Sequence, residues 1–300
     1  MMPGRPPAPR GFAWRLAGAA IRLALIVVAG VVICAALVRY SPGFGSEESD
    51  IDARLSRETA LAIHQRDGMG QSFPAFALGY FRRAIHGDLG ISRTFNSPVA
   101  DLLRDRASAT GMLMVSGITM AWAAGLVLAW IAVCQPVAFF RAGAEMLAGI
   151  SLAIPAPVIA IAFFLWGTPV SAALALAILP RVFGTLRELL EEAWHSPALV
   201  FARARGVSGA AVAIRYVALP IAPQLTALMG VSLVLAFGSA IPVEALCDVA
   251  GIGQLAWRAA LGRDLPLLCG VAMAITFLVA LAQTGTELFH PETSRTEHSR

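Results

Sequence analysis

Long apolar segments, separated by short charged ones, make up most of the chain. An apolar helix of about 20 residues crosses the hydrocarbon core of a bilayer. Pro155 and Pro157 interrupt the third such segment and predict a kink there, because proline removes an amide donor from a helix. The pattern predicts an all-α polytopic membrane protein with six transmembrane helices, at residues 19–38, 110–133, 142–166, 169–183, 217–241 and 267–288.

The charged residues predict the topology. Residues 1–18 are rich in proline and arginine, which suits a cytoplasmic N-terminal segment held against anionic headgroups. Five arginines lie between Arg181 and Arg215, so the positive-inside rule places that part of the chain in the cytosol as well. We therefore expect both termini in the cytosol, with a transmembrane core over residues 109–291 and a cytoplasmic tail over residues 292–300.

The segment 39–108 mixes acidic residues with arginines and is expected outside the cytosol, because long translocated segments obey the positive-inside rule poorly. Within it, residues 71–83 and 98–106 predict short amphipathic helices on either side of a polar turn. A second outside segment is expected over residues 242–266, with a short helix over residues 254–261.

Composition excludes an ordinary soluble domain, since 57% of the residues are hydrophobic, 14% are charged and the mean hydropathy is +0.70. The formal charge of +4 comes from arginine, because the sequence contains no lysine. A Walker A loop requires a lysine, so ATP hydrolysis would take place on another polypeptide. The central parts of the predicted membrane helices hold no charged residue, which disfavours a carrier powered by its own proton or ion relay. We expect contact with lipid and not with nucleic acid.

No arrangement of residues predicts catalysis or metal binding. The histidines are far apart, and neither a His-Glu-x-x-His motif nor a Gly-x-Ser-x-Gly motif occurs. The cysteines have no metal-site spacing and are interpreted as small apolar residues: Cys34, Cys134, Cys247 and Cys269. We expect no catalytic residue, no metal and no cofactor bound by this chain.

A cationic helical hairpin lies between the fourth and fifth apolar segments. Ser196 can cap a helix, Pro197 suits its first position, and Gly206 can supply the left-handed residue that ends it; Ser208 offers a second helix start. Arg203, Arg205 and Arg215 keep this unit out of hydrocarbon. We expect it to be a docking element in which Leu199, Val200 and Phe201 fill a partner's groove while Arg203 and Arg205 pair with acidic groups at its rim. The alternative is a positive-inside loop that lies on lipid.

The hairpin motif resembles a known family. Ala-Arg-Ala-Arg-Gly at 202–206, followed by Arg215 and Pro220, is similar to the cytoplasmic coupling loop of ABC-importer permeases, and most similar to the dipeptide, oligopeptide and nickel branch. The resemblance implies an ATPase-coupling loop over residues 188–216, with contacts from Ser196, Leu199, Val200, Phe201, Ala202, Arg203, Ala204, Arg205, Gly206 and Arg215. Further family motifs, expected on the periplasmic side, are Gly87, Asp88, Gly90, Glu244, Gly251, Gly253, Arg263, Asp264 and Pro266.

The resemblance, which runs from about residue 78 to 291, implies a type I ABC-importer permease fold in a bacterial inner membrane. The implied partners are a second, similar permease, two ABC ATPase subunits that bind ATP and Mg, and an extracytoplasmic substrate-binding protein. The implied function is transport of peptides or a similar small solute by alternating access. Asp88 is expected in a turn, whereas Glu244 and the Arg263-Asp264 pair are expected on the outside, where they pair with one another, touch the delivery protein or are simply solvated.

Two other classes stay open at this point. A stand-alone membrane carrier or an intramembrane enzyme would carry the same cationic loop without any ATPase partner. A structural membrane scaffold would carry it without transport, and changes at Arg205 or Gly206 would then leave solute uptake unaffected.

Overall fold

The computed structural model describes residues 12–40, 73–134, 138–207 and 209–289, which are helical apart from short turns and an isolated antiparallel bridge between Ile91 and Pro98. The described residues contain no strand, which agrees with the all-α prediction. The helices are α1 (Phe12–Arg39), α4 (Phe73–Ala84), α5 (Val99–Cys134), α6 (Ala138–Ala153), α7 (Ala156–Leu165), α8 (Val170–Trp194), α9 (Pro197–Ala204), α10 (Gly209–Val212), the π-helix η1 (Ala213–Ala218), α11 (Leu219–Leu246), α12 (Ile252–Leu261) and α13 (Leu265–Phe289).

Among the described residues, five helical segments are long and apolar enough to cross a membrane. They coincide with the first, second, fourth, fifth and sixth predicted spans, and most are longer than predicted. The predicted tail 292–300 lies outside the described residues, as do residues 1–11 and 41–72. The five segments are Ala17–Leu37, Val99–Val133, Val170–Trp194, Ala213–Leu246 and Leu265–Gly285.

The third predicted span is broken into two helices. α6 ends at Ala153 and α7 begins at Ala156, with Pro155 as its N-cap in an extended conformation (φ −60°, ψ 142°). Pro155 has no N–H to donate, and its ring disfavours a helical residue before it, so the chain starts a new helix instead of bending one. The predicted kink is therefore a full break, and α6 and α7, with 16 and 10 residues, are each shorter than the helix of about 20 residues that crosses a bilayer.

Three of the predicted membrane helices are too short: α5 starts earlier than predicted, and α8 and α11 end later. The amphipathic segment 98–106 is not a separate helix but the start of the 36-residue α5. α8 continues past Phe183 to Trp194, through the buried Pro180 and the acidic stretch, and α11 continues past Pro242 to Leu246. Charged residues mark where a helix leaves the membrane, but glutamate, arginine and leucine are good helix formers and do not end it.

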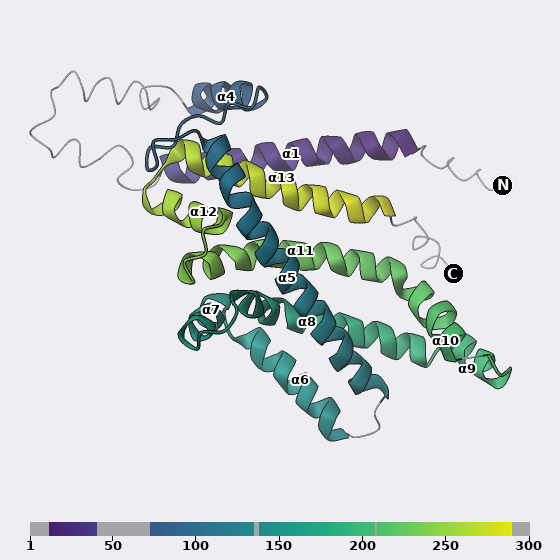
Figure 1. Cartoon of the computed structure of the whole chain (residues 1–300). Coiled ribbons are helices and arrows are strands. Elements are labelled where there is room, and N and C mark those ends of the chain that lie inside the picture. Colours follow the sequence, from purple (N-terminus) through teal and green to yellow (C-terminus); the bar gives the residue numbers. More distant parts are fainter. Residues whose placement is uncertain (1–11, 41–72, 135–137, 208, 290–300) are drawn as a thin grey trace, which may run out of the picture.

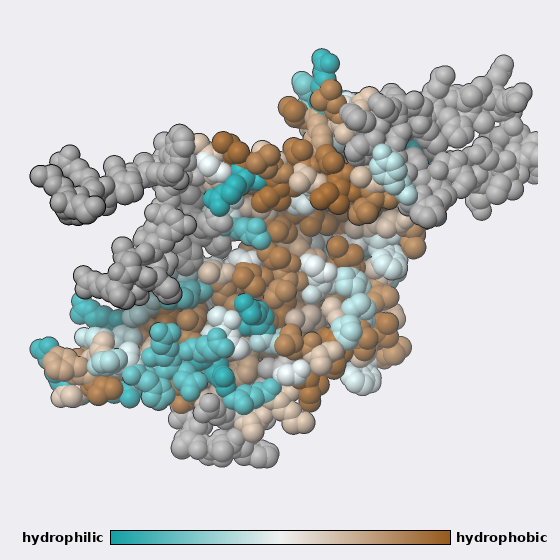
Figure 2. All heavy atoms as spheres, turned by 180° about the vertical axis from the view of Figure 1, so that it is seen from behind, coloured by the Kyte–Doolittle hydropathy of each residue, from teal (hydrophilic) through white to brown (hydrophobic). Residues whose placement is uncertain are grey.

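The centre of the fold is the packing of α5 against α8. Gly117 and Gly125 of α5 face Leu174 and Val182 of α8 so closely that a Cβ atom at either glycine would lie within 3 Å of the facing side chain. Most of the largest core cluster comes from these two helices and α11. Figure 2 shows apolar side chains over the middle of the molecule, with hydrophilic ones gathered toward the end that carries α9.

The two ends of the molecule carry different elements. Figure 1 places α9 and α10 at the same end as the first residues of α1 and the last residues of α13. α4 and α12 lie at the opposite end, where α5 begins and α11 ends. This arrangement separates the cationic hairpin from the Gly-Asp and Arg-Asp motifs by the full length of the apolar helices.

Gly125→Ala should weaken the α5–α8 contact, because the new Cβ would lie 2.9 Å from Cγ1 of Val182, a stiff β-branched side chain, and 3.4 Å from the Phe183 nitrogen. We expect a loss of about 1–3 kcal/mol in the free energy of unfolding. Gly111→Ala, in the same helix with nothing within 4 Å of the new atom, is the control and should gain up to about 1 kcal/mol. Thermal unfolding in detergent measures both, and equal shifts would contradict the packing described.

Candidate functional site

The short helix α9 begins and ends as its sequence predicts. Ser196 is the N-cap, and its side-chain oxygen accepts the Leu199 N–H at 3.3 Å. At the other end Gly206 adopts a left-handed conformation (φ +73°), and the Val207 N–H reaches back to the Ala202 carbonyl at 3.2 Å. These bonds close both ends of α9 and make it a rigid unit. The second predicted cap, Ser208, lies outside the described residues.

The apolar side chains of α9 divide between two faces. Leu199 and Ala202 are buried, and Leu199 belongs to the largest core cluster of the chain itself. Val200 and Phe201 are 61% and 65% exposed. The prediction that Leu199 fills a partner's groove is therefore wrong, since this side chain anchors α9 to its own transmembrane core. Val200 and Phe201 are the apolar residues that α9 presents outward.

The two arginines of the Ala-Arg-Ala-Arg-Gly motif also have different surroundings. The Arg203 guanidinium carbon lies 4.2 Å from the ring centroid of Trp194, the last residue of α8. The Arg205 guanidinium carbon lies 5.7 Å from the ring centroid of Phe201, on the outward face. The prediction gave both arginines the same outward role, but Arg203 contacts an aromatic ring of its own chain. Arg205 stays beside the exposed apolar residues, and Arg215 is exposed on η1.

The chain leaves the hairpin through a π-helical turn. η1 covers Ala213–Ala218 and continues directly into α11, whose first turn contains Pro220. Pro220 and Pro223 lack amide hydrogens, so two carbonyl groups of the preceding turn lose their usual donors, and a wider turn accommodates this. The fifth membrane helix thus begins within η1, ahead of the predicted start at residue 217.

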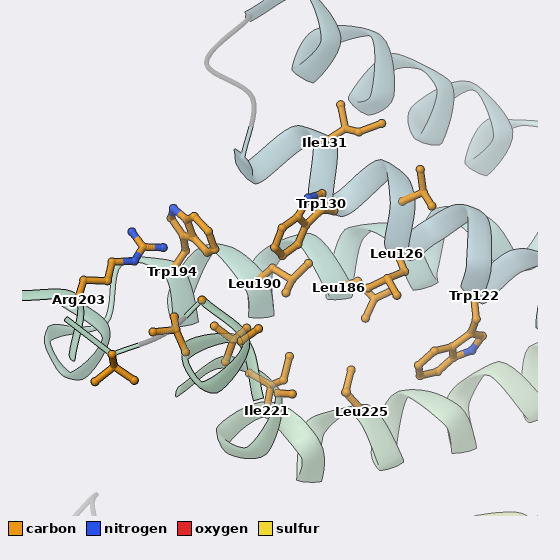
Figure 3. Close-up of a pocket in the computed structure, with 17 residues that line it drawn as sticks. Trp122, Leu126, Trp130, Ile131, Leu186, Leu190, Trp194, Arg203, Ile221 and Leu225 are labelled. Carbon is orange, nitrogen blue, oxygen red and sulfur yellow. The ribbon is translucent and has the colours of Figure 1, made fainter. Parts of the chain in front are cut away.

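A hollow of about 740 Å³ lies beside the hairpin (Figure 3). Its walls are almost entirely apolar and come from α5 and α8 on one side and from η1 and α11 on the other, while Arg203 is at its edge. The sequence does not predict this hollow, because the residues that line it are far apart in the chain and individually look like ordinary core residues. Labelled in Figure 3 are Trp122, Leu126, Trp130, Ile131, Leu186, Leu190, Trp194, Arg203, Ile221 and Leu225.

At the opposite end, the predicted Gly-Asp motif forms a turn. Gly87 and Gly90 both have positive φ (+82° and +83°), and the Asp88 carboxylate accepts the Gly90 N–H at 2.9 Å. Asp88 is therefore the turn residue that the sequence predicts. Gly90 lies close to Pro266, since a Cβ atom at Gly90 would be 3.5 Å from Cβ of Pro266. Two motifs that are far apart in sequence thus meet here.

Asp264 is fully buried at the start of α13. Its Oδ2 accepts hydrogen bonds from the Ser92 hydroxyl at 2.6 Å and from the Thr94 N–H at 2.9 Å. Its Oδ1 accepts the Leu267 N–H at 3.2 Å, in the first turn of α13. The expectation that Asp264 is a solvated or delivery-protein residue is wrong: it fastens the loop before α5 to the start of α13. The preceding residue, Arg263, is left-handed (φ +50°) and ends α12.

Glu244 is fully buried near the end of α11, so the expectation that it is solvated or touches a delivery protein is wrong. Its Oε2 accepts the Gly253 N–H at 2.6 Å and the Gln254 N–H at 3.3 Å, both in the first turn of α12. A carboxylate at a helix N-terminus is favoured by the free N–H groups and the helix dipole. The Thr110 hydroxyl accepts the Ile252 N–H at 2.8 Å, so α5 also helps to fix this helix end.

The two glycines of the Gly-Ile-Gly motif make room for this contact. A Cβ atom at Gly251 would collide with the Glu244 carboxylate, and one at Gly253 would lie 2.7 Å from the backbone Cα of Ile241. Glu244 and Asp264 therefore hold α12 at both ends, through its first N–H groups and through the segment that follows it. The family motifs in the sequence include most of this cluster but not Thr94, Thr110 and Gln254, which are ordinary polar residues until the fold brings them together.

The arrangement offers a rigid, capped cationic helix at one end, a clamped short helix at the other, and a long helix pair between them. Among the described residues, no group of three His, Cys, Asp or Glu side chains is placed to hold a metal ion. Residues 117–290, more than half of the chain, match the family model described as the binding-protein-dependent transport system inner membrane component.

The chain belongs to this family. It is the permease component of an ABC importer and a multi-pass membrane protein, which confirms the resemblance carried by the hairpin and the outer motifs. A Brucella suis biovar 1 protein described as a peptide permease is 24% identical to this permease over 299 residues, covering 88% of this chain and 92% of the relative. The nickel import system permease of Staphylococcus aureus is 24% identical over 269 residues, covering 84% of this chain and 82% of the relative.

Asp264→Asn should weaken the hydrogen bonds that Asp264 makes around α12. Both carboxylate oxygens of Asp264 accept hydrogen bonds, and the substitution replaces one of them with an NH2 group. A buried donor left without its acceptor costs about 1–3 kcal/mol, so we expect the free energy of unfolding to fall by that amount. Asp105→Asn is the matched control, because Asp105 is an exposed aspartate of α5 outside this cluster. Thermal unfolding in detergent measures both, and an Asp264 variant as stable as the control would contradict the clamp.

Proposed function

We propose that this permease is one of two similar subunits that form the translocation pathway of an ATP-driven importer in a bacterial inner membrane. One observation carries the proposal: α9 is closed at both ends, anchored inward by Leu199, and presents Val200, Phe201 and Arg205 outward. An apolar pair beside a fixed positive charge fits a groove with an acidic rim on a soluble partner. A loop that only lay on lipid would not need the rigid, capped helix.

The partners in this proposal are two ABC ATPase subunits at the α9 end, a second permease beside this one, and a substrate-binding protein at the α12 end. ATP and Mg bind the ATPase subunits, and the permease itself binds no cofactor. Both termini then lie in the cytosol, because α1 begins and α13 ends on the same side as α9 (Figure 1). Peptides or a similar small solute are the proposed cargo, in line with the relatives described as peptide and nickel permeases.

The proposed mechanism is alternating access. Closure of the ATPases displaces α9, whose caps keep it from unwinding under load. The displacement reaches α8 directly and α11 through η1, while the close α5–α8 packing makes these two helices move together. The pathway is thereby exposed to one side of the membrane and then to the other. Family membership argues against the stand-alone carrier, the intramembrane enzyme and the scaffold.

Co-purification tests the proposal. The tagged wild-type chain, extracted in mild detergent from its native host, should bring down an ATPase with a phosphate loop and a second permease, as identified by mass spectrometry. Arg205→Glu should reduce the recovered ATPase by about tenfold or more, because it places a like charge against an acidic rim. Arg104→Glu, an exposed charge reversal on α5 near the opposite end, is the control and should retain the ATPase. A folded wild-type chain that comes down alone would refute the proposal.

A further inference from the structure

We propose that Trp194 is the positioning residue that carries a displacement of α9 into α5, because it holds Arg203 over its ring and Trp130 against it. This inference rests on the proposed function, in which α9 receives the force of the ATPase. It gives the two arginines of the hairpin different roles: Arg205 faces the partner, and Arg203 passes the movement inward.

The contacts form a continuous path across three helices. The Arg203 guanidinium carbon of α9 lies 4.2 Å from the centroid of the Trp194 ring, which is the distance of a cation–π contact. The Trp194 ring of α8 meets the Trp130 ring of α5 with centroids 5.7 Å apart and planes at 82°, an edge-to-face pair. Figure 3 shows Arg203, Trp194 and Trp130 in this order along the edge of the hollow.

Both contacts depend on orientation, unlike the apolar anchor at Leu199. A guanidinium that slides off the face of an indole loses its attraction to the ring, and an edge-to-face pair is favourable over a limited range of geometries. If α9 moves, the Trp194 ring therefore keeps its two partners only by moving with Arg203 and taking Trp130 along. Leu199 holds α9 against the core. The contacts from Arg203 through Trp194 to Trp130, here called the aromatic path, direct the movement of α9 toward α5.

The hollow allows this movement. Trp130 and Trp194 both line it, so neither ring is enclosed by close-packed side chains on that side. Protein interiors are packed too tightly for large rings to shift without displacing their neighbours. Here the two rings border a space of about 740 Å³, into which they can turn when the hairpin is displaced.

The test follows the movement of α5 in the purified complex of this permease with its native partners. Val127→Cys introduces a thiol on α5, at a position that is 58% exposed and lines the hollow. Maleimide labelling of its peptide, quantified by mass spectrometry, is compared with and without ATP and vanadate, which trap nucleotide on the ATPases. We expect the labelling rate at position 127 to differ between the two states.

Adding Trp194→Ala should bring the ratio of the two labelling rates closer to unity while the ATPases remain bound and still trap nucleotide, and the close α5–α8 packing accounts for the difference that remains. Trp194→Phe keeps an aromatic ring and should retain most of the difference in labelling rate that Trp194→Ala loses. A loss of side-chain bulk alone would not explain such a result. Arg203→Met, which removes the charge but keeps a long side chain, should act like Trp194→Ala, and the two together should be no worse than either one. Trp166→Ala, a 77% exposed tryptophan at the end of α7, is the matched control and should keep the wild-type ratio.

The possible outcomes separate this inference from the function on which it rests. If the complex traps nucleotide and Arg203→Met and Trp194→Ala both leave the full difference in place, as the control does, the aromatic path is refuted and the proposed function stands. If the complex that carries Val127→Cys alone shows no labelling difference, α5 does not follow α9, and the aromatic path is refuted as well. If no ATPase is recovered with the wild-type chain, the proposed function itself fails.

Discussion

Fixed positive charge on a helix that cannot enter hydrocarbon is the constraint on which the rest of the structure depends. Arg205 and Arg215 hold the hairpin at the membrane surface, while Leu199, fully buried, ties it to the transmembrane core. The hairpin therefore has a charged face at the membrane surface and an apolar contact with the transmembrane core. Because α9 is capped at Ser196 and closed at Gly206, a force on its exposed face is passed on to the core instead of unwinding the helix.

At the opposite end of the molecule, two buried carboxylates fasten the helix ends to one another. Glu244 receives the first N–H groups of α12, and Asp264 joins the loop before α5 to the start of α13. Both carboxylates are buried, and backbone amides and a serine hydroxyl group donate hydrogen bonds to them. α12 is thereby fixed to α5, α11 and α13, so a movement that begins at α9 meets a braced structure at the far end.

The sequence predicts local features well and distant contacts poorly. Ser196, Gly206 and the Gly87–Gly90 turn act through neighbouring backbone groups, so their roles follow from residue type and spacing. Pro180 and Pro242 did not end their helices, because the surrounding helix and core stabilise the turn that each proline weakens. The burial of Glu244 and Asp264, and the path from Arg203 through Trp194 to Trp130, depend on residues brought together from distant segments.

The most direct test of the central claim is a photo-cross-link from the exposed face of α9. With a photoreactive phenylalanine analogue in place of Phe201, irradiation of native membranes should yield an adduct with an ATP-hydrolysing subunit. The same analogue at Ile85, which is 83% exposed just after α4 at the other end of the molecule, should not. An adduct from Phe201 with lipid alone, in cells where the transporter is assembled and active, would contradict the claim that α9 is the site where the ATPase engages this permease.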